Sequence, residues 1–245
     1  MGRSVGVLGA GVMGSGIAQA LAAAGNEVVC HDASADALNR AEETVLTGRF
    51  GLNSAVARGK LSQAQAEAAA GRLTFTDEVR RLYDTDLVVE AVPERLDLKI
   101  SVFRDLDRNC PRRTVLASNS SGFPVAALAA ATDRPDRVIG WHWASPAPVM
   151  RLAEIVRGPL TSDATVALVT DLASSAGKNP VVINDAPTSW GYVANRVYFA
   201  AVREAARVVQ EKVATAEQVD RLMVDCFRWP VGPLAMRDGA ATGWD

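Results

Sequence analysis

Short apolar runs alternate with longer amphipathic stretches along most of the chain. The first two runs are Ser4 to Leu8 and Glu27 to His31, and a mostly apolar segment without proline, Ser15 to Ala24, lies between them. Continuous apolar runs of this length are typical of buried parallel strands, and the intervening segment has the length of a crossover helix. The alternation therefore predicts an α/β fold.

The same alternation continues to the neighbourhood of residue 186. Further strands are expected at 73–76, 86–92, 114–118, 137–143, 152–156 and 181–183, and helices at 96–106, 124–131 and 163–176. Gly177 follows the last of these helices and is expected to cap its C-terminus.

Two parts of the chain depart from this alternation. The stretch from Ala35 to Arg72 is too long for one crossover helix and is interrupted at residues 48–51 and 58–60, which predicts an inserted helical hairpin. From Trp190 onward only helical patterns remain. We therefore expect a Rossmann-type, doubly wound, mostly parallel sheet in residues 1–186 and a small all-helical C-terminal domain in residues 187–245.

The loop after the first strand has the spacing G-x-G-x-x-G. It contains Gly9, Gly11 and Gly14, with Val12 and Met13 between the last two. In a strand–loop–helix unit the first glycine allows a tight turn, the second lets the backbone approach a pyrophosphate, and the third lets the helix pack closely on the strand. The N–H groups at the helix start then bind the phosphates. The loop indicates a dinucleotide site, the alternative being a glycine-rich turn without a ligand.

Asp32 ends the second strand and favours NAD as the dinucleotide. It follows the glycine loop at roughly the 20-residue offset at which a carboxylate accepts the ribose hydroxyls. Its negative charge would also repel the additional phosphate of NADP. We expect the preceding His31 to lie beside the adenosine rather than to act as a base.

Composition narrows the class of protein. The 245 residues include 49% hydrophobic residues and carry a formal net charge of −2, so no overall field attracts the chain to nucleic acid or membrane. Cys30, Cys110 and Cys226 are isolated, which fits a reducing compartment and argues against a structural metal site. No signal peptide or membrane-spanning run is apparent. We expect a cytoplasmic protein.

Candidate chemistry lies at the carboxyl ends of the predicted strands, where ligands bind in open parallel sheets. His142 ends a strand in Gly140 to Pro146 and is a candidate general base, although it could also be a core residue packed between tryptophans. Glu154 lies in an apolar strand, where a carboxylate is costly unless it is paired. His142 is the expected partner of Glu154, and the alternative is an exposed position on an edge strand.

Two further polar segments are candidates. Ser118 to Gly122 follows a strand and could bind a ribose or a substrate oxygen, or it could form a turn that caps the next helix. Asn195, with Arg196, begins the helical domain and could reach back over the cleft.

These segments together resemble the L-3-hydroxyacyl-CoA dehydrogenase family. The matching segments are, in chain order, GAGVMGSGIA, the strand ending at Asp32, VVEAVPE, SNSS, GWHWASP, LAEIV, SAGKNPVV, Asn195-Arg196, and Gly232-Pro233-Leu234 with Asp238. The resemblance implies oxidation of the 3-hydroxyl of an acyl-CoA, with NAD accepting the hydride. Fatty acid β-oxidation is the metabolism that it implies.

The resemblance also implies roles for particular residues. His142 would take the hydroxyl proton, Glu154 would orient it and balance its charge, and Ser121 and Asn195 would hydrogen-bond the substrate oxygen. On the NAD side it places Glu94, Lys99, Asn119 and, at the position of a family asparagine, Ser145.

The helical hairpin corresponds to the family insertion that meets CoA. Its Arg49, Arg58, Lys60 and Arg72 could bind the CoA phosphates, or they could be ordinary solvated helix charges. The resemblance further implies a homodimer formed through the C-terminal domain. Because the chain ends at Asp245, before the last helices of family members, we expect this domain to be shortened.

Departures from the family pattern keep other substrates open. The family segment H-F-F-N-P reads His142 to Pro146 as HWASP here, and the family P-G-F is expanded to Pro187 to Tyr192. One alternative is a related dehydrogenase that acts on a 3-hydroxy acid, either free or bound to acyl carrier protein. A second is a non-catalytic NAD-binding or structural homologue.

Overall fold

The computed structural model describes residues 2–186, 188 and 190–242. The chain divides into two compact units, Met1–Trp190 and Gly191–Asp245, and each is described by itself.

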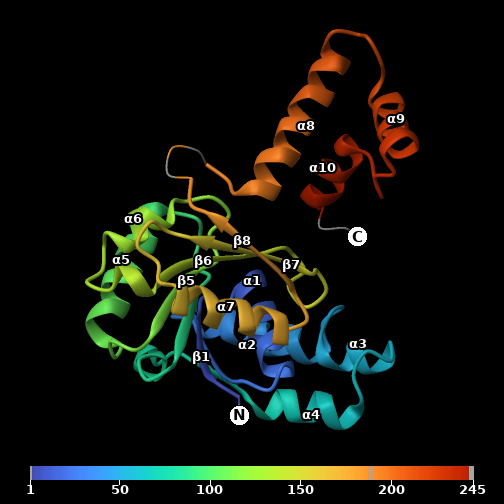
Figure 1. Ribbon diagram of the computed structural model, residues 1–245. Coiled ribbons are helices and arrows are strands. Elements are labelled where there is room, and N and C mark those ends of the chain that lie inside the picture. Colours follow the sequence, from blue (N-terminus) through green and yellow to red (C-terminus); the bar gives the residue numbers. More distant parts are fainter. Residues whose placement is uncertain (1, 187, 189, 243–245) are drawn as a thin grey trace. The chain divides into compact units, whose positions relative to one another are not determined.

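The first unit is built on an eight-stranded sheet (Figure 1). Its strands are β1 (Ser4–Leu8), β2 (Glu27–His31), β3 (Leu73–Thr76), β4 (Leu87–Glu90), β5 (Val115–Ser118), β6 (Val138–Trp143), β7 (Leu152–Arg157) and β8 (Asn179–Asn184). Their order is β3-β2-β1-β4-β5-β6-β7-β8. Strands β1 to β6 are parallel, whereas β7 runs antiparallel to β6 and parallel to β8. The expected Rossmann-type, mostly parallel sheet is confirmed.

Helices cover both faces of this sheet. They are α1 (Val12–Ala23), α5 (Leu96–Asn109), α6 (Val125–Ala129) and α7 (Asp163–Ser175), with short 3₁₀ turns at Val79–Leu82 and Pro135–Arg137. Figure 1 shows α5 and α6 on one side of the sheet and α1 with α7 on the other. Strands β4 and β5 are buried throughout, as their continuous apolar sequences predict.

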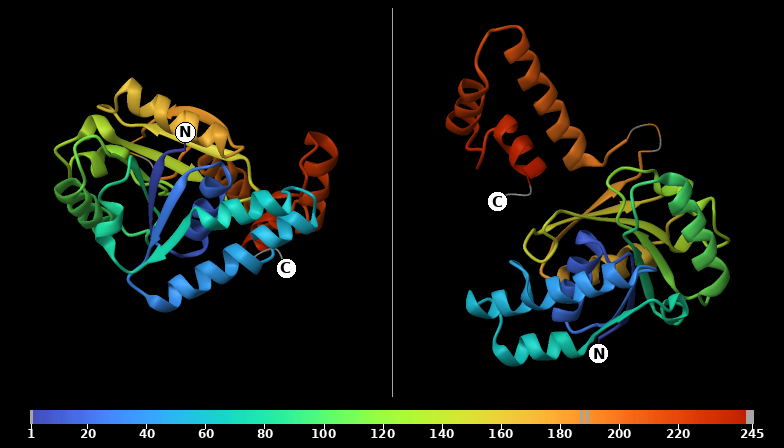
Figure 2. Two further views of the ribbon diagram at one scale, coloured as in Figure 1. Left: turned by 90° about the horizontal axis from the view of Figure 1, so that it is seen from below. Right: turned by 180° about the vertical axis from the view of Figure 1, so that it is seen from behind.

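The inserted segment contains three helices rather than the two of the expected hairpin. They are α2 (Ala35–Thr47), the short α3 (Leu52–Ala57) and α4 (Gln63–Gly71), and Figure 2 shows them as a group attached to the first half of the sheet. Val45, Leu52, Ala66 and Ala69 form their common core. The additional helix is α3. Its N-cap is Gly51, whose N–H donates to the carbonyl of Gly48 in the turn that follows α2.

The second unit is helical, with α8 (Val193–Gln210), α9 (Ala216–Phe227) and α10 (Pro233–Thr242). Val202, Ala205, Val219 and Leu234 are its buried residues. Asp220 on α9 accepts hydrogen bonds from the backbone N–H groups of Leu234 (2.8 Å) and Ala235 at the start of α10, which fixes the two helices together. Within the described part of the chain, no helix has the length and apolar character needed to cross a membrane.

Candidate active site

The candidate site lies along the carboxyl ends of the parallel strands. The order in which the strands are added to the sheet reverses between β1 and β4, and open α/β sheets bind their ligands at such a position. A cavity of about 760 Å³ opens there, lined among others by Gly9, Gly11, Asp32 and Val92. The cavity is large enough to take part of a dinucleotide.

The three glycines of the loop meet the requirements that the sequence predicts. Gly9 has a φ of +106°, a conformation that side-chain-bearing residues rarely adopt. A Cβ atom on Gly14 would lie 1.7 Å from the carbonyl oxygen of Gly9, so only glycine lets α1 begin this close to β1. A Cβ on Gly11 would meet nothing within 4 Å, which leaves its backbone open to a ligand. The loop therefore fits a pyrophosphate at the start of α1.

Asp32 lies beside this loop, as expected. Its Oδ2 accepts a hydrogen bond from the N–H of Ala10 (2.9 Å) and its Oδ1 one from Ser34 (3.0 Å), so the loop and the end of β2 fix the carboxylate in place. His31 is buried and lines the same cavity. Burial, with a smaller effect of Asp32, raises the pKa of the Cys30 thiol to about 12, which excludes Cys30 as a nucleophile near neutral pH.

A buried ion-pair network follows β4. The carboxylate of Glu90 is fully buried and accepts hydrogen bonds from Lys99 Nζ (2.6 Å), Val92 N (2.8 Å) and Ser118 Oγ (2.6 Å). Lys99, also buried, makes a second ion pair with Glu94 at 3.1 Å. The strand expected at 86–92 ends at Glu90, because this side chain takes the N–H of Val92 that would otherwise continue the strand.

The segment after β5 is tied to the same network. Glu94 Oε1 accepts hydrogen bonds from Ser120 Oγ (2.5 Å) and from the N–H of Ser121 (2.9 Å). Ser120 Oγ in turn accepts from the N–H groups of Gly122 and Phe123. Glu94, Lys99 and Ser121 are thereby brought together at the ends of two neighbouring strands.

Asn119 joins this segment to the next strand. Its Oδ1 accepts a hydrogen bond from the N–H of Trp143 (3.0 Å), at the end of β6. The alternative role of this segment as a helix cap is wrong, since the N-cap of α6 is Pro124 and makes no side-chain cap hydrogen bond.

His142 and Glu154 form a buried pair. The antiparallel register of β6 and β7 places the two residues directly opposite each other. His142 Nδ1 lies 2.7 Å from Glu154 Oε2, and both side chains are buried. An ionised carboxylate can only accept at this contact, so a neutral His142 paired with it carries its proton on Nδ1 and leaves Nε2 as the acceptor nitrogen. The exposed edge position considered for Glu154 is therefore wrong.

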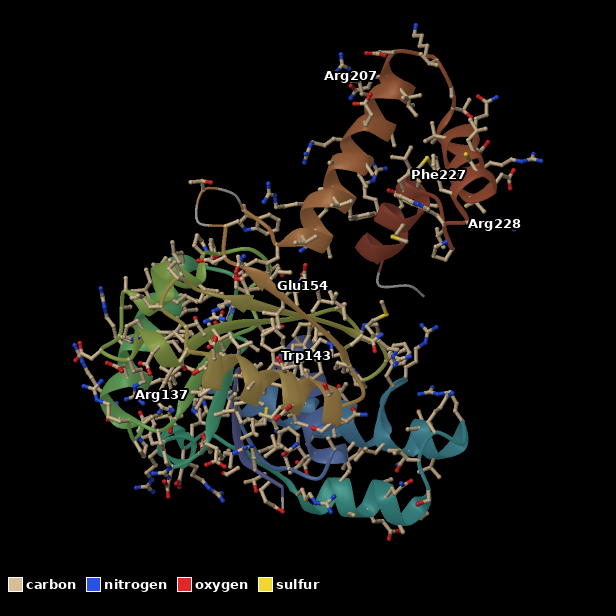
Figure 3. The ribbon with its side chains drawn as sticks, in the orientation of Figure 1. Arg137, Trp143, Glu154, Arg207, Phe227 and Arg228 are labelled. Atoms are coloured by element: carbon tan, nitrogen blue, oxygen red, sulfur yellow. The ribbon has the colours of Figure 1, made fainter. Side chains whose placement is uncertain are left out.

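The flanking tryptophans do not enclose the histidine. Successive side chains of a strand point to opposite faces, and Trp141 and Trp143 belong to the core cluster that includes Ile17 of α1 and Leu172 of α7. Their rings lie 5.0 Å apart, centroid to centroid, and Figure 3 labels Trp143 and Glu154 in the sheet of this unit. His142 therefore faces the other side of the sheet, away from this cluster.

A second large cavity, of about 700 Å³, is lined by cationic residues of the insertion. Arg49, Arg58 and Lys60 line it together with Phe50 and Pro148. The guanidinium groups of Arg49 and Arg58 lie 5.3 and 5.9 Å from the centroid of the Phe50 ring, and Arg58 donates to the carbonyl of Arg49. Three of the predicted CoA contacts thus share one cavity, whereas Arg72 is not among its lining residues and follows α4 as the C-cap.

The remaining predicted residues lie in separate places. Ser145 lies in the loop between β6 and β7, next to Pro146. Asn195 lies in the first turn of α8 and belongs to the second unit. Of the expanded segment before α8, Pro187 and Ser189 lie outside the described residues.

Sequence reasoning missed two buried charged residues of this region. Glu90 lies inside the strand expected at 86–92, and Lys178 lies in the segment SAGKNPVV directly after Gly177, but neither is singled out by its charge. A charged residue inside or next to an apolar strand was the available signal, since such a group is costly without partners.

Comparison with known proteins covers both units. Residues 4–186 match the family described as 3-hydroxyacyl-CoA dehydrogenase, NAD binding domain. Residues 191–244 match the family described as 3-hydroxyacyl-CoA dehydrogenase, C-terminal domain.

Individual relatives show the same similarity. The chain is 40% identical over 233 residues to a probable 3-hydroxybutyryl-CoA dehydrogenase of Deinococcus radiodurans, covering 95% of this chain and 81% of that protein. The crystal structure of (S)-3-hydroxybutyryl-CoA dehydrogenase from Ralstonia eutropha superimposes with a TM-score of 0.90 at 38% identity, covering 96% of this chain and 81% of that one.

A relative that is named for a different activity is also similar. The chain is 34% identical to 5-formyl-3-hydroxy-2-methylpyridine 4-carboxylate 5-dehydrogenase of Mesorhizobium japonicum, over 97% of this chain and 76% of that protein. The family matches span nearly the whole sequence. The chain therefore belongs to the 3-hydroxyacyl-CoA dehydrogenase family.

Proposed function

We propose that this protein oxidises the 3-hydroxyl of an acyl-CoA thioester to the 3-keto compound, reversibly and with NAD. The observation that carries the proposal is the buried His142–Glu154 pair on the strand edge that also bears the glycine loop and Asp32. The family membership supports it. Bound NAD supplies the acceptor for the hydride that leaves C3 of the substrate.

In this proposal the protein moves the proton and holds the substrate. His142 Nε2 takes the proton of the 3-hydroxyl, and the carboxylate of Glu154 stabilises the imidazolium that forms. Ser121 and Asn195 hydrogen-bond the substrate oxygen. In the reverse direction His142 returns the proton to the same oxygen.

The residues proposed to hold NAD follow the ends of five strands, β1, β2, β4, β5 and β6. The glycine loop with Val12 and Met13 would hold the pyrophosphate, and Asp32 the adenosine ribose. The proposed contacts near the nicotinamide are Glu94, Lys99, Asn119 and Ser145. We also propose that residues 1–186 form the NAD-binding domain and residues 187–245 the helical domain for substrate and dimerisation.

Arg49, Arg58 and Lys60 are proposed to bind the phosphates of CoA. Their common cavity on the insertion supports this role, because three cations in one cavity match the phosphates of a nucleotide carrier. A truncated substrate tests it: Arg58→Glu and Lys60→Glu should raise KM for acetoacetyl-CoA and leave KM for acetoacetyl-N-acetylcysteamine unchanged. Equal effects on both substrates would contradict a role toward CoA.

The activity itself is tested by NADH consumption with acetoacetyl-CoA, for the wild type and for His142→Ala. We expect turnover by the wild type and a loss of several orders of magnitude in the variant. A wild type that binds NADH without turnover would reject the CoA substrate. The same assay would then be run with a 3-keto acid, free and bound to acyl carrier protein.

A second candidate is a related reaction on a 3-hydroxy compound that carries no CoA. Two observations support this candidate. Trp143-Ala144-Ser145 stands where the family has an aromatic pair and an asparagine, and one relative is named as a pyridine-carboxylate dehydrogenase. A kcat/KM for a free 3-keto acid above that for acetoacetyl-CoA would favour this candidate.

We further propose a cytoplasmic homodimer that associates through the helical domain. Leu222 and Phe227 on α9 are 62% and 64% exposed, and Val197 on α8 is 66% exposed, which is typical of surfaces that pair with another chain. Sedimentation should give the mass of a dimer for the wild type and of a monomer for Leu222→Asp with Phe227→Asp. A monomeric wild type would contradict the proposal. Cell fractionation tests the compartment.

A further inference from the structure

The loop between β6 and β7, residues 144–151, forms a wall of the cavities beside the insertion. Pro148 and Val149 line the cavity of about 700 Å³ that contains the cationic residues. Pro146, Ala147 and Pro148 line a smaller cavity of about 170 Å³ that also borders Val12. Because the loop directly follows β6, its position affects both the proposed CoA cavity and the strand that carries the candidate base.

Lys178 holds this loop from the side of β8. Its Nζ donates hydrogen bonds to the carbonyl oxygens of Ala147 (2.6 Å) and Met150 (2.8 Å), and it lies 5.1 Å from the centroid of the Trp143 ring. The residue is only 6% exposed. One ammonium group thus joins two carbonyls of the loop and the last residue of β6.

The backbone of Lys178 is itself fixed. Gly177 has a φ of +72°, its N–H donates to the carbonyl of Ser174, and the N–H of Lys178 donates to that of Ala173. This arrangement is a Schellman motif, which ends α7 in a defined geometry. The N–H of Asn179 then donates to Arg151 O (2.8 Å) at the start of β7. Lys178 therefore extends from a rigid helix end toward a loop without regular structure.

Packing alone does not account for a lysine here. Among the described residues, no carboxylate lies within ion-pair distance of Lys178, so the buried charge has only carbonyl and ring partners. Burying an ammonium costs free energy that an apolar side chain of the same length would not. What the ammonium adds is a pair of charge-assisted hydrogen bonds that fix two loop carbonyls.

We propose that Lys178 is a positioning residue that sets residues 147–150, the part of the loop beyond Ser145, as a wall of the acyl-CoA site. The inference rests on the proposed function and extends it to a residue that contacts neither substrate nor cofactor. Lys178 acts through Ala147 and Met150, and through them on Pro148 and Val149 at the cavity.

Steady-state kinetics of Lys178→Met test the proposal. We expect KM for acetoacetyl-CoA to rise on the order of tenfold, the effect of losing a charge-assisted contact, while KM for NADH stays within about twofold. Lys178→Arg, which keeps the charge, should recover part of the loss. The exposed Lys212→Met is the matched control and should leave both constants unchanged.

A second variant reaches the loop from the opposite side. A Cβ on Gly16 of α1 would lie 3.0 Å from Pro148 Cδ and 3.1 Å from Ala147 Cβ, so Gly16→Ala displaces the loop while residue 178 remains a lysine. It should raise KM for acetoacetyl-CoA in the same way. This variant decides the question if Lys178→Met does not fold.

The results distinguish a failure of the proposed function from a failure of the role of Lys178. A wild type without activity on acetoacetyl-CoA rejects the proposed function and the role of Lys178 together. An active wild type with an unchanged KM in Lys178→Met, or in Gly16→Ala where only that variant folds, overturns the positioning role alone. Equal increases in KM for acetoacetyl-CoA and NADH would also overturn it, because they indicate a general structural role.

Discussion

At the scale of single residues, the site depends on charges that the protein buries in pairs. His142 faces Glu154 across two antiparallel strands, and Lys99 faces Glu90 and Glu94 at the ends of parallel ones. His142, Glu154 and Glu90 lie on strands of the sheet, and Lys99 lies on α5. A buried charge left without its partner is strongly unfavourable, so removal of one member should have large and specific effects.

Glu154→Gln tests the histidine pair. The amide keeps the size of the carboxylate but can present an N–H to Nδ1, which would favour the wrong tautomer of His142 and would not stabilise its charged form. We expect kcat to fall by about 10² to 10⁴ with little change in NADH affinity, as in other carboxylate–histidine arrangements. Exposed Glu42→Gln is the control, and a Glu154→Gln enzyme with normal kcat would contradict the assignment.

Glu90→Gln tests the network after β4. Without this charge Lys99 loses its closest partner, at 2.6 Å, and its position relative to Glu94 and Ser118 changes. We expect the Kd for NADH, measured by fluorescence titration, to rise on the order of tenfold. In Lys99→Met the further effect of Glu90→Gln should be small, because the two residues act together. Fully additive effects would argue against the coupling.

Lys178 also predicts a pH dependence of stability. Burial lowers the pKa of Lys178 from 10.5 to about 8 in the folded protein. Between these values the unfolded chain binds more protons than the native one, so the free energy of unfolding rises with pH. Relative to Lys178→Met, the wild type should therefore gain stability between about pH 8 and about pH 10.5 in urea denaturation. A difference that is constant with pH would contradict the lowered pKa.

At the scale of elements, the apolar pattern predicted the strands and most helices within a few residues. It succeeded where burial is continuous, as in β4 and β5. It did not predict the short α3, because a six-residue helix is too short for its periodicity to be recognised. The Glu90–Lys99–Ser118 contacts could not be predicted either, since they depend on which strands become neighbours.

The close contact between Gly14 and Gly9 predicts the effect of a substitution at the junction of β1 and α1. A Cβ on Gly14 would lie 1.7 Å from the carbonyl oxygen of Gly9, so Gly14→Ala must move the helix away from the strand. We expect a loss of about 1–3 kcal/mol in the free energy of unfolding together with weaker NADH binding. Gly71→Ala is the control, because its Cβ meets nothing within 4 Å and α4 should gain stability. Equal stability of the two variants would contradict the close packing.

At the scale of the whole molecule, net charge does not predict where the site lies. The net charge of −2 does not reveal that three cations gather in one cavity of the insertion. The order of motifs along the chain was more informative, and the family matches to both units agree with it. Fold class and cofactor followed from that order, whereas the residues that position the site required the three-dimensional contacts.

The most direct test of the central claim compares wild type and His142→Ala in acetoacetyl-CoA-dependent NADH oxidation, with NADH affinity measured in parallel. The account predicts that kcat falls by a factor of about 10³ or more in the variant, while the Kd for NADH stays within about twofold. A variant that keeps its kcat, with NADH bound as in the wild type, would show that His142 is not the base and would contradict the account.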